Sequence, residues 1–285
     1  MTRNLAQRIA FAVVAIPLAV GLVWWGGWPL AGALGLLGVL GAREVYGLAR
    51  RQGIDPLDGM GLAAAAVIPL ATYWVKGSET RWAEPAIFAA ALWLLALLVA
   101  AMWRGPERRP LPVVSVTVFG ALYASALPSF LIAIRHGANA GVKSWPLAVL
   151  VLLPLALTWI CDTAAMAAGS AIGGPKLAPL LSPNKTWAGA IGGFSAAVAA
   201  AVLLGGWVLP RVGLTLSAGR LVLVGATVGL VAQVGDVAES LFKREAQVKD
   251  SSNLIPGHGG VLDRLDSLYF VLPVSAGLFR LFGLV

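Results

Sequence analysis

Charged residues are scarce in this 285-residue chain: they make up 12% of the sequence, against roughly 25% in soluble domains. Hydrophobic residues make up 59%, and several long stretches carry no charge at all: 9–25, 85–103, 144–161 and 188–210. Apolar runs of about 17 to 25 residues can cross hydrocarbon as helices. The composition therefore argues against a soluble protein and predicts an all-α, polytopic integral membrane protein.

Other absences narrow the class further. The single cysteine, Cys161, excludes an internal disulfide framework and a cysteine-based structural zinc site. Short strands of alternating polarity are missing, which argues against a β-barrel, and no repeat of 20 to 50 residues indicates a repeat array. The net charge is +8, but no basic stripe with interleaved aromatics indicates a nucleic-acid partner.

Apolar runs and their polar breaks predict about nine transmembrane helices. The predicted ranges are 9–25, 28–48, 59–75, 85–103, 113–134, 146–168, 187–208, 219–241 and 267–284. The breaks are too short for a soluble domain. We therefore divide the chain into an N-terminal part, 1–145, with about five helices, and a C-terminal part, 146–285, with about four helices and catalytic loops.

The basic residues predict the orientation of these helices. With alternating sides, 14 of the 21 Lys and Arg residues share a side with the N-terminus. This asymmetry predicts a cytoplasmic N-terminus. The first apolar run follows Arg3 and Arg8 as in a signal peptide, but no small-residue cleavage pattern ends it, so we expect a retained helix.

Acidic residues inside apolar helices direct attention to the C-terminal part. Asp162, Asp236 and Glu239 lie within predicted spans, where each carboxylate costs at least about 2.5 kcal/mol and needs a partner or a metal. On a helix, Asp236, Glu239, Ser240 and Lys243 share one face. An inter-helix hydrogen-bond seam or a snorkelling lysine would explain this face equally well.

The loop after this helix has the composition of a polyanion site. Lysine and arginine neutralise phosphates, and glycine backbone can approach phosphate oxygens closely. The residues concerned are Lys243, Arg244, Lys249, Arg264, Gly257, Gly259 and Gly260. Asp250, Asp263 and Asp266 are candidate ligands of a divalent metal. A solvated cytoplasmic loop would explain the cations alone. His258 is a weak candidate for a general base, because a phosphate monoester is largely ionised near neutral pH.

A second loop, 169–187, lies on the same predicted side. Its glycines and prolines indicate a turn-rich connector, and Ser182, Lys185 and Thr186 offer donors to an anionic ligand. Asp162 precedes it by about two helical turns.

Residues 240–266 resemble the signature of the phosphatidate cytidylyltransferase family, the CDP-diacylglycerol synthases. The segment reads Ser-Leu-Phe-Lys-Arg, four residues, then Lys-Asp-Ser-Ser-Asn-Leu-Ile-Pro-Gly-His-Gly-Gly-Val-Leu-Asp-Arg-Leu-Asp, and it matches the family pattern throughout. A second family segment is matched less closely. Departures stand at Ala164, Met166, Ser170, Asn184 and Ala188.

The resemblance implies transfer of CMP from CTP to phosphatidate, giving CDP-diacylglycerol and pyrophosphate. It implies a site facing the cytoplasm of a bacterial plasma (inner) membrane, with CTP, phosphatidate and bilayer lipid as partners; a homodimer and a monovalent co-ion such as K⁺ stay open. Magnesium would be held chiefly by Asp236 and Asp263, with Asp250 and Asp266 as further candidates. Catalytic roles would fall to Asp162, Asp236, Lys243, His258, Asp263 and Arg264. Substrate contacts would fall to Ser182, Lys185, Thr186, Ser240, Arg244, Lys249, Asp250, Gly257, Gly259 and Gly260.

Two rival functions explain part of the pattern. An ion-coupled transporter would use the intramembrane carboxylates as ion sites, but it predicts broken helices in two related halves, whereas the polar residues here gather in one half. Another CTP-dependent membrane enzyme, such as a lipid kinase, would move the γ-phosphoryl group and release CDP.

Overall fold

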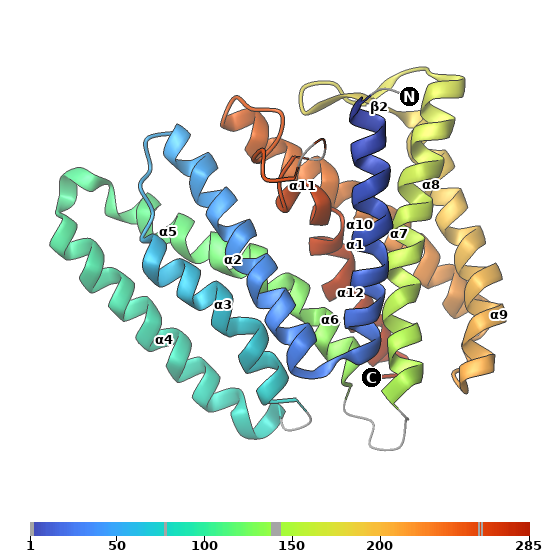
Figure 1. The fold of residues 1–285 in the computed structure, drawn as a ribbon, viewed down its shortest axis with the longest axis horizontal. Coiled ribbons are helices and arrows are strands. Elements are labelled where there is room, and N and C mark those ends of the chain that lie inside the picture. The colour runs from blue at the N-terminus through green and yellow to red at the C-terminus, as the bar shows by residue number, and fades with distance from the viewer. Residues whose placement is uncertain (1–2, 77–78, 138–143, 256, 258) are drawn as a thin grey trace.

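The structure is a computed structural model that describes residues 3–76, 79–137, 144–255, 257 and 259–285 (Figure 1). The first half consists of helices joined by short loops. They are α1 (Arg3–Trp25), α2 (Gly27–Arg51), α3 (Asp58–Trp74), α4 (Glu79–Arg104), η1 (Pro106–Arg108), α5 (Pro110–Ala121), the π-helical turn η2 (Leu122–Ala126) and α6 (Leu127–Arg135).

The second half adds one small sheet to the helices. Its elements are α7 (Ser144–Ile172), β1 (Lys176–Ala178), β2 (Ser182–Thr186), α8 (Trp187–Ala200), the π-helical turn η3 (Ala201–Gly205), α9 (Gly206–Val208), η4 (Leu209–Val212), α10 (Ala218–Glu245), α11 (Leu262–Leu265) and α12 (Leu268–Leu281).

Each of the nine predicted ranges overlaps helical structure, with ends that differ by up to six residues, as at the starts of α1 (Arg3) and α4 (Glu79). Two of them are composite: α5, η2 and α6 run on continuously, as do α8, η3 and α9. Within the described residues, five helical segments are long and apolar enough to cross a membrane: 83–104, 110–135, 145–172, 187–212 and 218–245. The all-α membrane class is therefore confirmed, and the number of spans stays a prediction.

The connector after α7 differs from the sequence-based expectation. Helix α7 continues through Gly169 to Ile172 and ends at Gly173 and Gly174, which have positive φ angles of 69° and 95°. The chain then forms the antiparallel hairpin β1–β2, with Lys176 opposite Thr186. A predicted loop is thus partly helix and partly hairpin, because a single glycine lowers helix stability by only about 1 kcal/mol relative to alanine and does not end a helix.

Small residues let the helices pack closely. On α8, a Cβ at Gly193 would lie 2.7 Å from the Cys161 carbonyl oxygen of α7, and on α2 a Cβ at Gly38 would lie 2.8 Å from Ser125 Oγ of η2. Such contacts are typical of helices that associate in lipid, where dispersion between closely approaching backbones replaces the hydrophobic effect.

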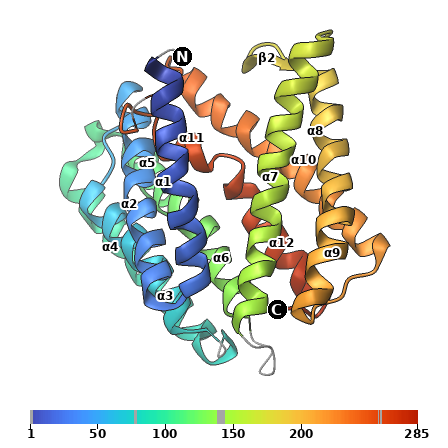
Figure 2. The same ribbon diagram turned by 45° about the vertical axis from the view of Figure 1, so that its right-hand side comes forward.

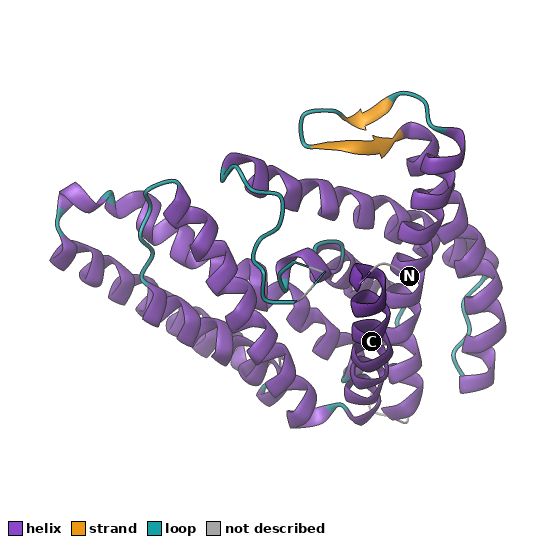
Figure 3. Cartoon of the chain, turned by 45° about the horizontal axis from the view of Figure 1, so that its top comes forward, coloured by secondary structure: helices purple, strands orange, loops and turns teal. Residues whose placement is uncertain are grey.

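The polar connections gather at one end of the molecule. The start of α1, the hairpin β1–β2 and the loop between α10 and α11 lie at the same end, and α9 and the C-terminus lie at the opposite end (Figures 1 and 2). In Figure 3 the end that carries the hairpin is turned forward, and the hairpin and the loop between α10 and α11 are both visible there. Helix α4 forms the outer edge and exposes apolar side chains such as Phe88 and Leu95, as suits contact with lipid.

Candidate active site

The C-terminal end of α10 carries a buried ion-pair cluster. Lys243 Nζ lies 2.9 Å from Glu239 Oε1 one helical turn earlier and 2.7 Å from Asp263 Oδ1 of α11. The exposed fractions of Glu239, Lys243 and Asp263 are only 1%, 8% and 8%. One cation therefore compensates two carboxylates in a region of low dielectric, where such interactions are strong.

Asp263 is fixed on its other side by the loop that precedes it. Its Oδ2 accepts hydrogen bonds from the Ser251 amide (2.8 Å), the Ser251 hydroxyl (2.7 Å) and the Gly260 amide (2.8 Å). Burial alone would raise the pKa of Asp263, but the bonds from Lys243, Gly260 and Ser251 outweigh it and lower the pKa below its usual value. Asp263 is therefore a carboxylate anion at neutral pH.

A carboxylate from the first half of the chain completes this arrangement. Glu44, on α2, accepts hydrogen bonds from the Ser251 and Ser252 hydroxyls and from the Val261 and Leu262 amides. Glu44 is not among the site residues predicted from the sequence. Its position inside the predicted span 28–48 is the signal that could have identified it, because a carboxylate in an apolar span needs partners.

The hairpin and α10 are joined by two polar contacts. Lys185 Nζ of β2 lies 2.6 Å from Asp236 Oδ2, and Arg244 Nε donates to the Leu181 carbonyl in the hairpin turn at 3.1 Å. The structure thus brings both predicted loops to one end of α10. Asp236 pairs with Lys185 rather than with Lys243, although all three were expected in one site.

Asp266 belongs electrostatically to a second group of carboxylates. Burial and the nearby Asp236 and Asp162 carboxylates raise the pKa of Asp266 to about 7, while the Ser267 amide, 2.6 Å from Asp266 Oδ1, and Lys243 oppose the shift. The charges of three acidic residues, from α7, α10 and the α11–α12 junction, therefore act on one another.

The remaining predicted residues lie around these two groups. Ser240 is buried on α10, and Ser182 is half-buried at the start of β2. Thr186 Oγ1 accepts from the Gly189 amide and so caps the start of α8. Lys249, Asp250, Gly257 and Arg264 are exposed, Gly259 packs against Asp263, and His258 lies outside the described residues.

Comparison with known proteins decides the family. A model described as the Cytidylyltransferase family matches residues 6–282. This chain belongs to that family. Among cytidylyltransferases, a phosphatidate cytidylyltransferase of Synechocystis sp. is 32% identical over 288 residues, covering 94% of each chain. One from Pseudomonas aeruginosa is 36% identical over 282 residues, 96% of each chain. One from Brucella suis is 40% identical over 197 residues, 67% of this chain and 62% of its own.

The candidate metal ligands of this cytidylyltransferase are carboxylates, the oxygen donors that magnesium takes. Magnesium is usually bound by one or two carboxylates together with substrate phosphates and water. No three His, Cys, Asp or Glu side chains converge as a metal site in the described part of the chain. The Asp236 side chain is 34% exposed, and its negative charge helps to raise the pKa of Asp266. Two carboxylates such as Asp236 and Asp266 suit a metal ion whose remaining ligands are phosphate oxygens of the substrate and not further protein groups.

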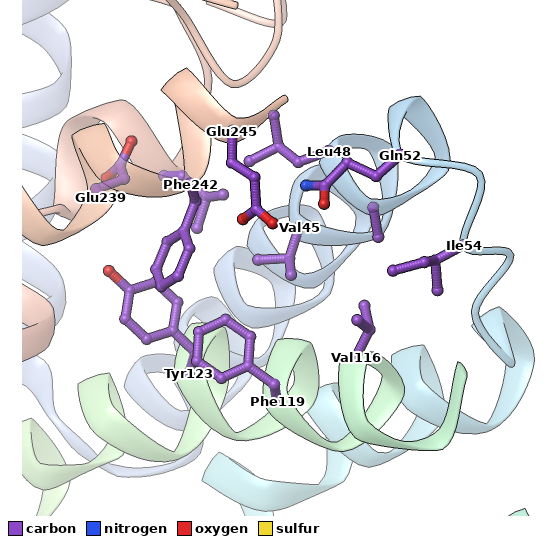
Figure 4. A pocket seen from close by; sticks show the side chains of 12 residues that line it. Val45, Leu48, Gln52, Ile54, Val116, Phe119, Tyr123, Glu239, Phe242 and Glu245 are labelled. Carbon is purple, nitrogen blue, oxygen red and sulfur yellow. The ribbon is translucent and has the colours of Figure 1, made fainter. Parts of the chain in front are cut away.

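An apolar groove runs beside the ion-pair cluster (Figure 4). Its volume is about 230 Å³, and its walls come from α2, the loop after it, α5, η2, α10 and α11. The lining is mostly apolar, with Gln52 and Glu245 among its polar residues. Three aromatic rings form one side: the Phe119 ring centroid lies 5.2 Å from that of Tyr123 and 5.3 Å from that of Phe242. Glu239 and Leu262 also line it, so the groove extends to the helices that carry Lys243 and Asp263.

Proposed function

We propose that this chain is a phosphatidate cytidylyltransferase, which transfers CMP from CTP to phosphatidate and gives CDP-diacylglycerol and pyrophosphate. The observation that carries the proposal is the convergence of both polar loops on the end of α10, where Lys185 meets Asp236 and Lys243 meets Asp263. A site with cations and carboxylates at the end of apolar helices can receive a nucleotide from water and a lipid phosphate from the bilayer. The family and its phosphatidate cytidylyltransferase members support this assignment.

The reaction needs no nucleophile from the protein. A phosphate oxygen of phosphatidate attacks the α-phosphorus of CTP in line, the new P–O bond forms, and the bond to pyrophosphate breaks. Catalysis then consists of positioning and charge neutralisation. Lys185, Arg244, Lys249 and Arg264 are the cations proposed to hold phosphate oxygens, and Ser182, Thr186, Ser240 and the glycines of the loop stay candidate contacts.

Magnesium is the proposed cofactor. It would supply charge compensation on the triphosphate when bound. Asp236 and Asp263 are the proposed principal ligands, and Asp266 and Asp250 are the further candidates. Asp263 would offer Oδ1, which faces one donor among the described residues, whereas Oδ2 faces three.

The topology that accompanies this proposal has nine spans, a cytoplasmic N-terminus and a site facing the cytoplasm, in a bacterial inner membrane. The 14 to 7 distribution of Lys and Arg between the two sides supports it, as does the position of the start of α1 and both loops at one end of the molecule (Figure 1). A reporter that is active only outside the cytoplasm should function when fused to the C-terminus. Activity of the same reporter after residue 53 would contradict this orientation.

Product analysis separates this function from that of a CTP-dependent lipid kinase. With CTP labelled at the α-phosphorus, a cytidylyltransferase places label in the lipid and releases unlabelled pyrophosphate. A lipid kinase would place label in the lipid only from γ-labelled CTP and would release CDP. Finding the second pattern would overturn the proposal while leaving a lipid substrate in place.

The Lys185–Asp236 pair should matter for turnover far more than for stability. Both side chains are a quarter to a third exposed, at 25% and 34%, so solvent screens their attraction. We expect Lys185→Met and Asp236→Asn each to lower kcat by roughly 100-fold, as when one charge-stabilising group is removed, with melting temperatures close to that of the wild type. Arg51→Met, at an exposed position on α2, is the control. A fall in melting temperature with kcat unchanged per folded molecule would assign the pair a structural role.

The apolar groove is the proposed place for an acyl chain of phosphatidate. Val116 lines it, so Val116→Trp should narrow it and raise KM for phosphatidate roughly tenfold, while KM for CTP stays unchanged. Val99→Trp, on the outward face of α4, is the matched control because that side chain is 46% exposed. Equal effects of the two variants, or a change in KM for CTP alone, would contradict this placement.

A further inference from the structure

Glu44 is a buried carboxylate that binds the loop of the candidate site across more than 200 residues of sequence. Its exposed fraction is 7%, and among the described residues no cation pairs with it. Four donors surround it instead: the Ser252 hydroxyl (2.7 Å) and Val261 amide (2.9 Å) on Oε1, and the Ser251 hydroxyl and Leu262 amide (both 2.9 Å) on Oε2. Charge-assisted bonds of this kind are about twice as strong as neutral ones.

Glu44 and Asp263 accept hydrogen bonds from consecutive amides of the same turn. The Gly260 amide donates to Asp263, and the next two amides, of Val261 and Leu262, donate to Glu44. The Ser251 hydroxyl lies 2.7 Å from Asp263 Oδ2 and 2.9 Å from Glu44 Oε2. Since a hydroxyl has one proton, it donates to one carboxylate at a time, and the position of each carboxylate depends on the other.

Gly260 shows how closely Glu44 approaches this turn. A Cβ at position 260 would collide with both Glu44 carboxylate oxygens and with Ser251 Oγ. The Glu44 carboxylate thus occupies the space next to the Gly260 Cα. The glycine at this position permits the contact between the two halves of the chain.

We propose that Glu44 is a positioning residue for cytidylyl transfer: it fixes residues 251–252 and 261–262, and through them Asp263, relative to Lys243, without touching substrate. The inference rests on the proposed function. It assigns to α2, in the half of the chain that carries none of the predicted site residues, the task of holding the site in its working geometry. Displacement of reacting groups by about 1 Å can lower a rate by about 100-fold, so a lost anchor should appear in kcat.

The Glu44→Gln variant tests this role with little change in size. Each carboxylate oxygen accepts from one backbone amide, so whichever way the glutamine amide points, its NH₂ group faces an N–H donor. We expect kcat to fall by about 100-fold while KM for CTP stays within about threefold. Glu44→Asp keeps the charge and should recover part of kcat. Glu107→Gln, on the exposed η1, is the control.

A second readout does not depend on activity. Lys249 is exposed in the loop that Glu44 holds, so trypsin cleavage after Lys249 should be faster in Glu44→Gln than in the wild type. If wild-type protein transfers no CMP to lipid, the proposed function fails, and the cleavage rates still decide whether Glu44 holds the loop. Unchanged cleavage together with kcat within twofold of the wild type would overturn the inference.

Ser252→Ala keeps the inference testable if Glu44→Gln does not fold. This variant removes one of the four donors to Glu44 and should lower kcat by roughly threefold, as expected for one hydrogen bond. A loss of activity that only follows the loss of folded protein, with kcat per folded molecule unchanged, would show a purely structural role and would also overturn the inference.

Discussion

Replacing Lys243 by methionine should abolish turnover and lower the free energy of unfolding by about 3–5 kcal/mol, the range for breaking a buried ion pair from one side. Lys243 Nζ bonds both Glu239 and Asp263, and all three residues are at most 8% exposed. Methionine fills a similar volume but leaves two carboxylates without their shared cation.

Unfolding in mixed micelles of increasing denaturing-detergent content, together with turnover, measures both effects. Arg280→Met removes a cation from an exposed position on α12 and should leave stability within about 0.5 kcal/mol of the wild type. The double variant Glu239→Gln/Lys243→Met should be more stable than Lys243→Met alone, because one of the two unpaired charges is gone. A Lys243→Met protein as stable and active as the wild type would contradict the ion-pair cluster.

Replacing Asp263 by asparagine should lower kcat by at least about 100-fold at saturating magnesium. Asp263 is the acceptor for Lys243 on one oxygen and for the Ser251 and Gly260 amides on the other. In either orientation, the asparagine NH₂ group faces a donor, so α11 must shift away from α10 or from the loop. Full turnover of this variant would show that Asp263 neither binds magnesium nor organises the site.

The same variant should change the acid sensitivity of the protein. The pKa of Asp263 is lower in the folded state than in the unfolded chain, so its contribution to stability is fully present above the unfolded value, about 3.9. That contribution is lost as the pH falls through the lower folded value. Stability measured as a function of pH should therefore decline less steeply below about pH 4 in Asp263→Asn than in the wild type.

Runs of apolar residues predicted the helices, and the spacing of charged residues predicted part of the site. The helix ranges follow from runs of apolar residues, since the hydrocarbon core of a membrane requires backbone groups to bond within the segment. The contact between Glu239 and Lys243 follows from their spacing of four residues on α10. Local patterns of this kind depend only on neighbouring residues, so a single sequence contains them.

The contacts between distant segments could not be predicted in the same way. Glu44 contacts Ser251 across 207 residues of sequence. Asp236 pairs with Lys185 of the hairpin and not with Lys243, which shares its helix face. These pairings depend on how α2, the hairpin and α10 pack, which periodicity does not determine. The hairpin β1–β2 also escaped prediction, because its strands are only three and five residues long and the second is polar and contains Pro183.

The central claim is that this chain, with its site at the end of α10, transfers CMP from CTP to phosphatidate. The most direct test is to incubate the purified wild-type protein in detergent with magnesium and α-labelled CTP, with and without phosphatidate, beside Asp263→Asn. Label should enter the lipid fraction only when phosphatidate and magnesium are both present, and the variant should show almost none. Absence of label from lipid with folded wild-type protein would contradict the claim, as would equal labelling by the variant.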